Sequence, residues 1–197
     1  MASKSRHYHH GDLKRELIRL SLARLQAGGL EALSLRKIAA EAGVNHTAAY
    51  AHFPTKDALI AAVLEWGYDT LADTLESGVE SDEDPVSRLI QMGLIYHSFC
   101  RDYSELFFLM MGPRINKGND YPELERALQR AYAFILGPIE DIGAKASLGA
   151  ATAPAFWASL QGFLAQILTA RVKVRPDKEV VLVEDYLQTL CRGFDLA

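Results

Sequence analysis

Residues 34–56 place two short helical segments around a glycine, and this arrangement constrains the fold more than any other part of the chain. The segment reads SLRKIAAEAGVNHTAAYAHFPTK. Ser34 precedes a run of apolar residues at helical spacing, as an N-cap does, and its hydroxyl can accept from a first-turn amide. Gly43 stands where the first helix must end, because glycine adopts the left-handed cap conformation without steric cost. Asn45 can cap the second helix, and Pro54 prevents that helix from continuing. Two helices joined in this way form a helix-turn-helix, whose second helix fits a DNA major groove.

A longer set of residues at fixed offsets carries a family resemblance. These residues are Ser34, Leu35, Arg36, Lys37, Ile38, Ala39, Ala42, Gly43, Val44, Asn45, Tyr50, Phe53, Lys56 and Leu59. They resemble the DNA-binding domain of the TetR (tetracycline-repressor) family, in which Tyr-x-x-Phe-x-x-Lys-x-x-Leu ends the recognition helix and starts helix four. The resemblance is strong over about residues 10–66 and rests on length and helical pattern beyond them.

Helical periodicity runs along the whole chain, without a persuasive alternating strand pattern. Asp12 is expected to cap the first helix, and Gly28-Gly29 to end it. Later helices are expected near residues 57–75, 85–101, 103–111, 122–142, 153–171 and 177–194. The sequence therefore predicts an all-α protein of about nine helices. The resemblance implies a three-helix DNA-binding domain with an N-terminal arm over residues 1–56. It also implies a ligand-binding and dimerisation domain over residues 57–197, in which the last two helices of each subunit form a four-helix bundle. The apolar face of the last helix is expected to meet the second subunit through Val180, Val183, Leu187, Leu190 and Phe194.

Charge is distributed unevenly, although the net formal charge of the chain is −4. Residues 1–60 hold nine Lys and Arg against five Asp and Glu, whereas the remainder holds 12 against 20. A basic head on an acidic body can meet phosphates while the body stays off the DNA. Cys100 and Cys191 lie far apart in helical patterns and are expected to be buried, reduced thiols of a cytoplasmic protein. The uncharged stretch 146–170 is interrupted by Pro154 and polar residues, so no membrane span is expected.

The resemblance assigns DNA contacts residue by residue. Ser34 and Arg36 match contacting positions of the first helix, and His46, Thr47 and Ala48 occupy the base-reading positions of the second. Imidazole and hydroxyl groups can bond base edges, and a methyl can meet the thymine methyl. Phosphate-contacting positions are matched by Tyr50, His52 and Lys56. Ala51 replaces a usual aromatic residue, so one contact of the family pattern is missing here.

Candidates for lining an effector pocket are aromatic, sulfur-containing and apolar residues of the body. They are Tyr96, Phe99, Cys100, Tyr103, Phe107, Phe108, Met111, Trp157, Gln161 and Leu164. Each can equally be ordinary core, since aromatic stripes at helical spacing usually pack against neighbours. The segment from Trp157 resembles a Trp-x-x-x-His-Gly signature of some family members, with Gln161 in place of the histidine.

The leading hypothesis is a ligand-responsive transcriptional regulator, a homodimeric repressor on a palindromic double-stranded DNA operator. A small, mainly apolar effector is expected to release it. The alternatives are a DNA-binding regulator without a ligand and a small helical enzyme. No phosphate loop, Cys-x-x-Cys, nucleophile elbow or helical His-Glu-x-x-His is present, so no cofactor and no catalytic site are predicted. The arm residues His7, His9 and His10 could bind metal, lie along DNA or have no role; no metal site is predicted.

Overall fold

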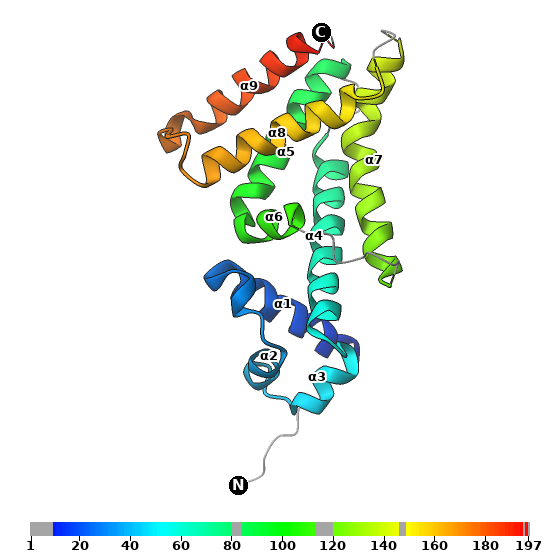
Figure 1. Cartoon of the computed structure of the whole chain (residues 1–197), viewed down its shortest axis with the longest axis vertical. Coiled ribbons are helices and arrows are strands. Elements are labelled where there is room, and N and C mark those ends of the chain that lie inside the picture. Colours follow the sequence, from blue (N-terminus) through cyan, green and yellow to red (C-terminus); the bar gives the residue numbers. More distant parts are fainter. Residues whose placement is uncertain (1–9, 80–83, 113–119, 146–148, 195, 197) are drawn as a thin grey trace.

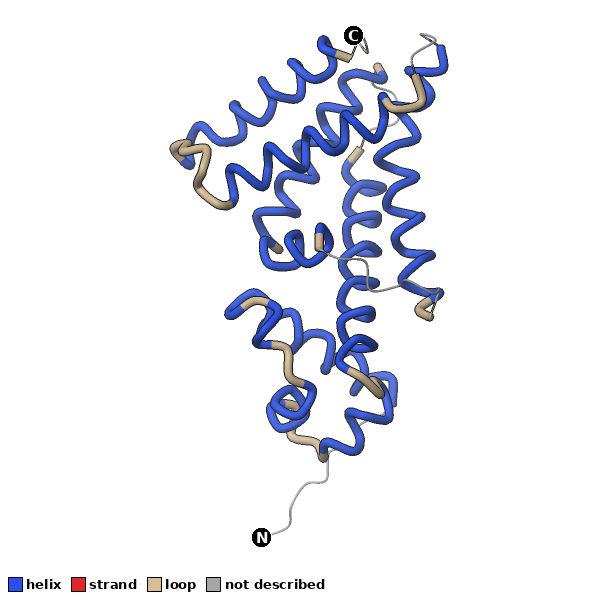
Figure 2. Tube along the Cα trace, in the orientation of Figure 1, coloured by secondary structure: helices blue, strands red, loops and turns tan. Residues whose placement is uncertain are grey.

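Helices joined by loops make up the protein in a computed structural model (Figures 1 and 2). The structure describes residues 10–79, 84–112, 120–145, 149–194 and 196. These residues form nine α-helices and two short 3-10 helices, without a strand among them. The α-helices are α1 (His10–Gly28), α2 (Leu35–Glu41), α3 (His46–His52), α4 (Lys56–Gly78), α5 (Pro85–Asp102), α6 (Ser104–Met111), α7 (Pro122–Lys145), α8 (Thr152–Leu168) and α9 (Glu179–Gly193). The 3-10 helices are η1 (Leu30–Ala32) and η2 (Pro176–Lys178). The all-α prediction is confirmed.

Helices α1, α2 and α3 pack around one small core, which we call the head. Its centre holds Leu17, Leu25, Ile38, Ala49 and Phe53, each at most 2% exposed. Small residues on the inner side of α3 let the helix approach the core closely, because Ala49 adds only a methyl group. The head lies at one end of the molecule in Figure 1, and its second and third helices face away from the rest.

Most of the predicted helix limits in the head are confirmed. Gly43 has a φ of 70°, and the Asn45 side chain accepts from the Thr47 amide at 3.0 Å. One predicted N-cap position is confirmed without its side-chain bond, and one is wrong. Ser34 holds the N-cap position of α2 but makes no side-chain capping bond. Asp12 does not cap α1, because that helix already begins at His10 and places Asp12 in its first turn.

Helix α4 joins the head to the body, which we define as α5–α9. Thr55 caps it by accepting from the Ala58 amide at 3.0 Å, as predicted. The helix continues to Gly78, one turn beyond its predicted end, and lies along α7. Arginines of α7 fix this contact: Arg126 binds Asp69 at 3.1 Å, and Arg130 binds Asp73 and Glu76 at 2.6 Å each. Helix α4 thus extends from the edge of the head to the far part of the body.

Helix α5 begins as the sequence indicated, with Pro85 in its first turn. The cap itself was not foreseen: the Asp84 carboxylate accepts from the amides of Val86 and Ser87 at 3.0 and 3.2 Å. A hydrogen bond from the Ser87 hydroxyl, together with these amide bonds, lowers the pKa of Asp84. The loop expected around residues 116–120 falls mainly outside the described residues. Helix α8 ends at Leu168, three residues earlier than predicted, and α9 begins only after η2.

Helices α5 and α9 approach closely where Gly93 faces Leu187, because a Cβ at Gly93 would collide with both terminal methyls of that leucine. One turn away, His97 Nε2 lies 2.7 Å from Glu179 Oε1, with both side chains 8% exposed. Arg101 reaches the second carboxylate oxygen at 3.3 Å. This contact buries the apolar face of α9 within its own subunit. Val183 and Leu187, expected to meet a second subunit, are therefore unavailable for that role.

Candidate DNA-binding surface and body pocket

The outer face of α3 carries the residues predicted to read DNA bases. His46, Thr47 and Tyr50 are exposed, and Tyr50 retains 45% of its accessible surface. His46 and Tyr50 are one helical turn apart, and their rings meet edge to face with centroids 6.5 Å apart. Ala48 is half-buried, with its methyl packed against the head core. Only part of Ala48 is therefore accessible beside the exposed His46 and Thr47.

The remaining predicted DNA contacts lie around that face. Arg36 is exposed on α2, Ser34 is half-buried before it, and His52 is half-buried at the last turn of α3. Lys56 is exposed at the first residue of α4, and its ammonium donates to the Leu30 carbonyl at 3.4 Å. This is a long bond, so the lysine can leave it for a phosphate. A phosphate there would also meet the amino end of α4, where the helix dipole favours negative charge.

A glutamine of the head bonds directly to the body. The Gln26 amide nitrogen donates to the Asp102 carbonyl at 2.8 Å. Its amide oxygen accepts from the Glu105 backbone N–H at 3.0 Å. Gln26 therefore bridges α1 to the joint between α5 and α6. Together with α4, it gives the head two mechanical links to the body.

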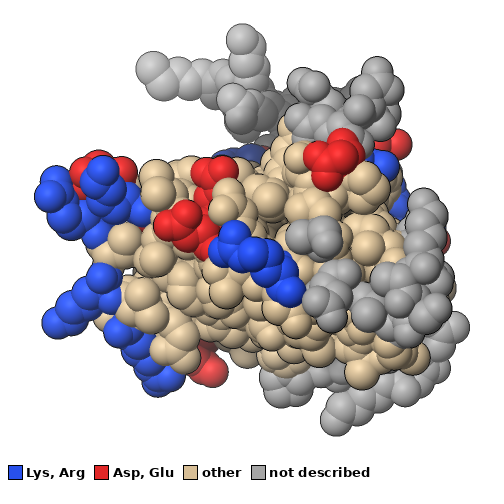
Figure 3. Space-filling view, turned by 90° about the horizontal axis from the view of Figure 1, so that it is seen from above, with Lys and Arg blue, Asp and Glu red and all other residues tan. Residues whose placement is uncertain are grey.

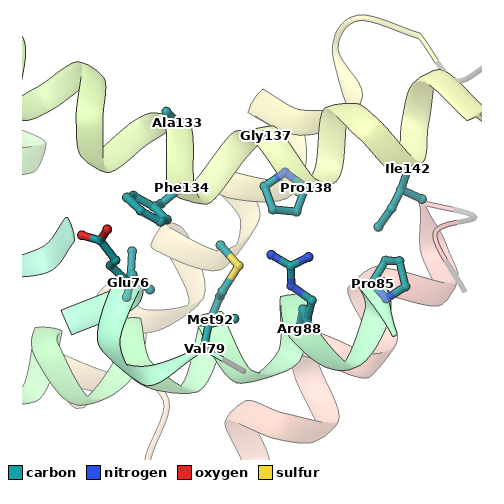
Figure 4. A pocket seen from close by; sticks show the side chains of 11 residues that line it. Glu76, Val79, Pro85, Arg88, Met92, Ala133, Phe134, Gly137, Pro138 and Ile142 are labelled. Atoms are coloured by element: carbon teal, nitrogen blue, oxygen red, sulfur yellow. The ribbon is translucent and has the colours of Figure 1, made fainter. Parts of the chain in front are cut away.

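The body contains a pocket of about 430 Å³ at the corner where α4 ends and α5 begins, facing the second half of α7. Figure 4 shows Glu76 and Phe134 at one end and Pro85 and Ile142 at the other. Met92 and Arg88 project from α5 between these ends. Most of the wall is apolar, and the volume falls within the roughly 300–1,000 Å³ of small-molecule sites.

Two adjacent residues of α7 explain why this corner is hollow. Gly137 presents no side chain, and a Cβ added there would meet nothing within 4 Å. Pro138 has no amide hydrogen to donate to the Phe134 carbonyl one turn earlier, so it interrupts regular helical bonding.

The pocket contains one paired and one unpaired charged side chain. Glu76 is bound at 2.6 Å by Arg130, which it shares with Asp73 and Asp69. Arg88 directs its guanidinium from α5 toward Pro138 across the pocket (Figure 4). Its Nε is buried and has no hydrogen-bond partner in the part of the chain that the structure describes. The terminal Nη groups carry the other donors of Arg88, and they face the pocket, where a ligand can reach them.

The predicted effector residues lie elsewhere, and none of the ten borders the 430 Å³ pocket. Tyr96 and Trp157 instead border a nearly filled apolar space of about 10 Å³, and their ring centroids are 4.4 Å apart. Gln161 donates to the Tyr96 hydroxyl at 3.4 Å. Phe99, Cys100, Phe107 and Leu164 are fully buried, Tyr103 and Phe108 are half-buried against the core, and Met111 is 44% exposed. Met92 borders both spaces and separates them.

Burial of this aromatic cluster excludes water from it. Burial raises the pKa of Tyr96 well above its usual range and raises that of the Cys100 thiol as well. Both groups therefore remain protonated. Cys191 is also buried, as predicted, and both cysteines are free. No group of three His, Cys, Asp or Glu residues suited to a metal ion occurs within the described ranges. His7 and His9 lie outside those ranges.

The connection between α8 and α9 adds local positive charge to the acidic body. Arg171, Lys173, Arg175 and Lys178 are all exposed there. Basic side chains gather at one edge of the molecule in Figure 3, which looks onto the end opposite the head. Among the described helices, none combines the length and apolar character needed to cross a membrane.

The sequence did not reveal Arg88 or the pocket around it. No role was assigned to Arg88 from the sequence. A signal was available in the Gly-Pro pair at 137–138 inside an otherwise regular helical pattern, since both residues weaken a helix interior. The arginine one turn into α5 gave no sequence signal that distinguished it from a solvated residue.

Comparison with known proteins points to one family. A model described as bacterial regulatory proteins, tetR family, matches residues 17–63, which include the whole of α2 and α3. Nucleoid occlusion factor SlmA from Sodalis glossinidius (strain morsitans) is 26% identical over 189 residues, covering 86% of this chain and 90% of that relative. The SlmA of Edwardsiella ictaluri (strain 93-146) is 29% identical over 101 residues, 50% of this chain and about half (51%) of that relative.

Solved structures share the fold over nearly the whole chain. A protein of unknown function from Rhodococcus sp. RHA1 is 29% identical, with a TM-score of 0.79 over 96% of this chain and 99% of that one. A TetR variant from Acinetobacter baumannii AYE, in complex with minocycline, is 20% identical, with a TM-score of 0.64 over 95% and 97% of the two chains. At that identity the likeness concerns the fold alone.

Proposed function

We propose that this protein is a repressor controlled by a small molecule. The chain belongs to the TetR family of bacterial regulatory proteins and is a DNA-binding transcriptional regulator, not an enzyme. In this proposal a homodimer holds a palindromic operator through its two heads. A small, mainly apolar effector occupies the body pocket and shifts the heads to a spacing that no longer fits the operator. The domain limits proposed for this division are residues 1–56 and 57–197.

The observation that carries this proposal is the course of α4. Its first residue, Lys56, lies beside the candidate DNA surface, and its last turn borders the pocket at Leu75 and Glu76. A helix of 23 residues is about 34 Å long. A ligand that displaces the pocket end of this helix also tilts the head at the other end. Gln26 couples the head to α5, which forms another wall of the pocket.

A pocket of this size favours an effector over a regulator that has none. An occupant that binds better to one spacing of the heads shifts the population toward that spacing, and DNA then weakens ligand binding by the same factor. The related TetR structure from Acinetobacter baumannii contains minocycline. That precedent supports a ligand in the body of this chain without indicating its chemistry.

We propose that α3 enters the major groove. Exposed Thr47 and His46 read base edges there, and the accessible part of the Ala48 methyl meets a thymine. Ser34, Arg36, Tyr50, His52 and Lys56 contact the backbone around the groove, which positions the head without specifying sequence. Two heads on one face of the duplex are then separated by about 34 Å or a multiple of it.

The dimer contact is proposed to use the outer sides of α8 and α9. Val180 and Val181 are 55% and 53% exposed at the start of α9, a large apolar exposure for two adjacent residues. Phe163 of α8 stacks on Tyr186 of α9 with ring centroids 3.8 Å apart, and both are only partly buried. A second copy can cover this surface with its own α8 and α9.

The test begins with selection of binding sites from a random double-stranded DNA pool by the full chain. Sedimentation equilibrium then gives the oligomeric state of the free protein and of its complex. We expect inverted repeats among the selected sites and two chains on each. A protein that stays monomeric at micromolar concentration and still binds DNA with full affinity would contradict the dimer. Selection of unrelated DNA sequences would contradict operator recognition.

A further inference from the structure

We infer that the pocket between α4, α5 and α7 binds a molecule with one carboxylate and an apolar body, with the carboxylate on Arg88. The inference names the chemical class of the effector and in that respect rests on the function proposed above. It does not depend on how the heads respond, because binding to the pocket can be measured without DNA.

The charges that face the pocket favour one anionic group. Glu76 is paired with Arg130, which also binds Asp73. The Asp84 carboxylate at the start of α5 is engaged by the Val86 and Ser87 amides. No carboxylate of the described residues pairs with Arg88, whose guanidinium faces the pocket. The Arg88 guanidinium is therefore the cationic group that an anionic ligand would meet in the pocket, and it would repel a cationic ligand placed beside it.

The shape of guanidinium favours a carboxylate over other single anions. Its planar arrangement of donors matches the two oxygens of a carboxylate, and charge-assisted bonds of this kind are stronger than neutral ones. Because the Arg88 Nε is tucked beneath the pocket surface, the terminal Nη groups are the ones that meet the ligand. A polyanion would lack a second cation, because Arg130 of α7 is already paired with Asp73 and Glu76 of α4.

The rest of the pocket suits a hydrocarbon body. Phe134, Val79 and Leu75 form the wall beyond Arg88, on the side of Glu76. Met92 stands between this pocket and the smaller space beside Tyr96 and Trp157. Methionine is unbranched and adapts its shape readily, so rotation of Met92 would let a long tail continue toward the aromatic cluster. An aliphatic or aryl-alkyl acid satisfies both ends of the site.

The experiment compares three probes that share one tail: decanoate, decanol and decylamine. Each is titrated into the free, full-length protein, with binding followed by calorimetry. We expect decanoate to bind at least about tenfold more tightly than decanol, because a hydrogen bond between two charged groups is stronger than one to a neutral hydroxyl. Decylamine is expected to show no binding.

Variants locate the site. Arg88→Gln should weaken decanoate about tenfold or more and leave decanol unchanged, whereas Arg175→Gln, an exposed arginine between α8 and α9, should change neither. Gly137→Leu, which fills the open space beside Pro138, should abolish binding of both probes. Thermal unfolding of each variant verifies that it is folded.

Equal binding of decanoate and decanol, or an unchanged decanoate affinity in a folded Arg88→Gln variant, would overturn the inference. Decanoate binding that depends on Arg88 but does not release operator DNA would leave the ligand class standing and count against the proposed release mechanism. The two claims therefore fail separately.

Discussion

At the scale of single residues, the head separates side chains that hold the fold from side chains that face outward. Ala49 and Phe53 point from α3 into the core, while Thr47 and Tyr50 point to the exterior. This division follows from helical spacing, which is why the sequence predicted both sets. The caps of α3 and α4 were equally predictable, because Asn45 and Thr55 bond amides two or three residues away.

The roles of Arg88 and Gln26 could not be predicted from helical spacing. Their roles depend on what lies opposite them: Gly137 and Pro138 for the arginine, and residues 102 and 105 for the glutamine. Such partners lie about 50 to 80 residues away along the chain, and local periodicity carries no information about them. Pocket positions were therefore assigned to aromatic residues, which the fold uses to fill the interior beside Met92.

Replacement of Lys56 by alanine should weaken binding to all DNA sequences similarly. The lost phosphate contact is expected to reduce the slope of log affinity against log salt by about one unit. Thr47→Val, by contrast, should change which sequences are preferred and leave that slope unchanged. Fluorescence anisotropy at several salt concentrations measures both effects.

Lys178→Ala is the matched control for Lys56→Ala, since it removes an exposed lysine from the body. Its salt slope should equal that of the unmodified protein. If Lys56→Ala also left affinity and slope untouched, the proposed contact at the start of α4 would be wrong.

At the scale of helices, amphipathic pattern identified the apolar face of α9 but not what covers it. Val183, Leu187 and Leu190 were expected to meet a second subunit, because a buried stripe looks the same whichever chain buries it. In the structure α5 covers them, and the contact is close because residue 93 is glycine. Only the start of α9 leaves large apolar side chains exposed.

Gly93→Ala tests the closeness of this helix contact. The added methyl collides with Leu187, and overpacking of this kind costs about 1–3 kcal/mol. The higher helix propensity of alanine offsets roughly 0.5–1 kcal/mol of that loss. We therefore expect the free energy of unfolding to fall by about 1–2 kcal/mol, measured by urea denaturation.

Gly193→Ala serves as the control for this variant. Gly193 is the last residue of α9, and a Cβ there would meet nothing within 4 Å. Its effect should stay within about 0.5 kcal/mol. A Gly93→Ala protein as stable as the unmodified chain would show that α5 and α9 pack less closely than described.

At the scale of the whole molecule, the central claim is that pocket and head communicate through α4 and Gln26. Ionic contacts of Arg126 and Arg130 hold α4 along α7, whose Gly137–Pro138 segment forms the opposite wall of the pocket. A ligand that separates these walls would displace the pocket end of α4, and the helix would carry that displacement to the head at its other end. Thermodynamic linkage then requires that operator binding weaken ligand binding as much as the ligand weakens operator binding.

Calorimetric titration of decanoate into the free protein, and separately into its complex with a selected operator fragment, tests this coupling directly. Typical couplings correspond to factors of about 5–150. The account predicts that decanoate binds the operator complex at least about fivefold more weakly than it binds the free protein. Equal decanoate affinities for the free protein and the complex would contradict it.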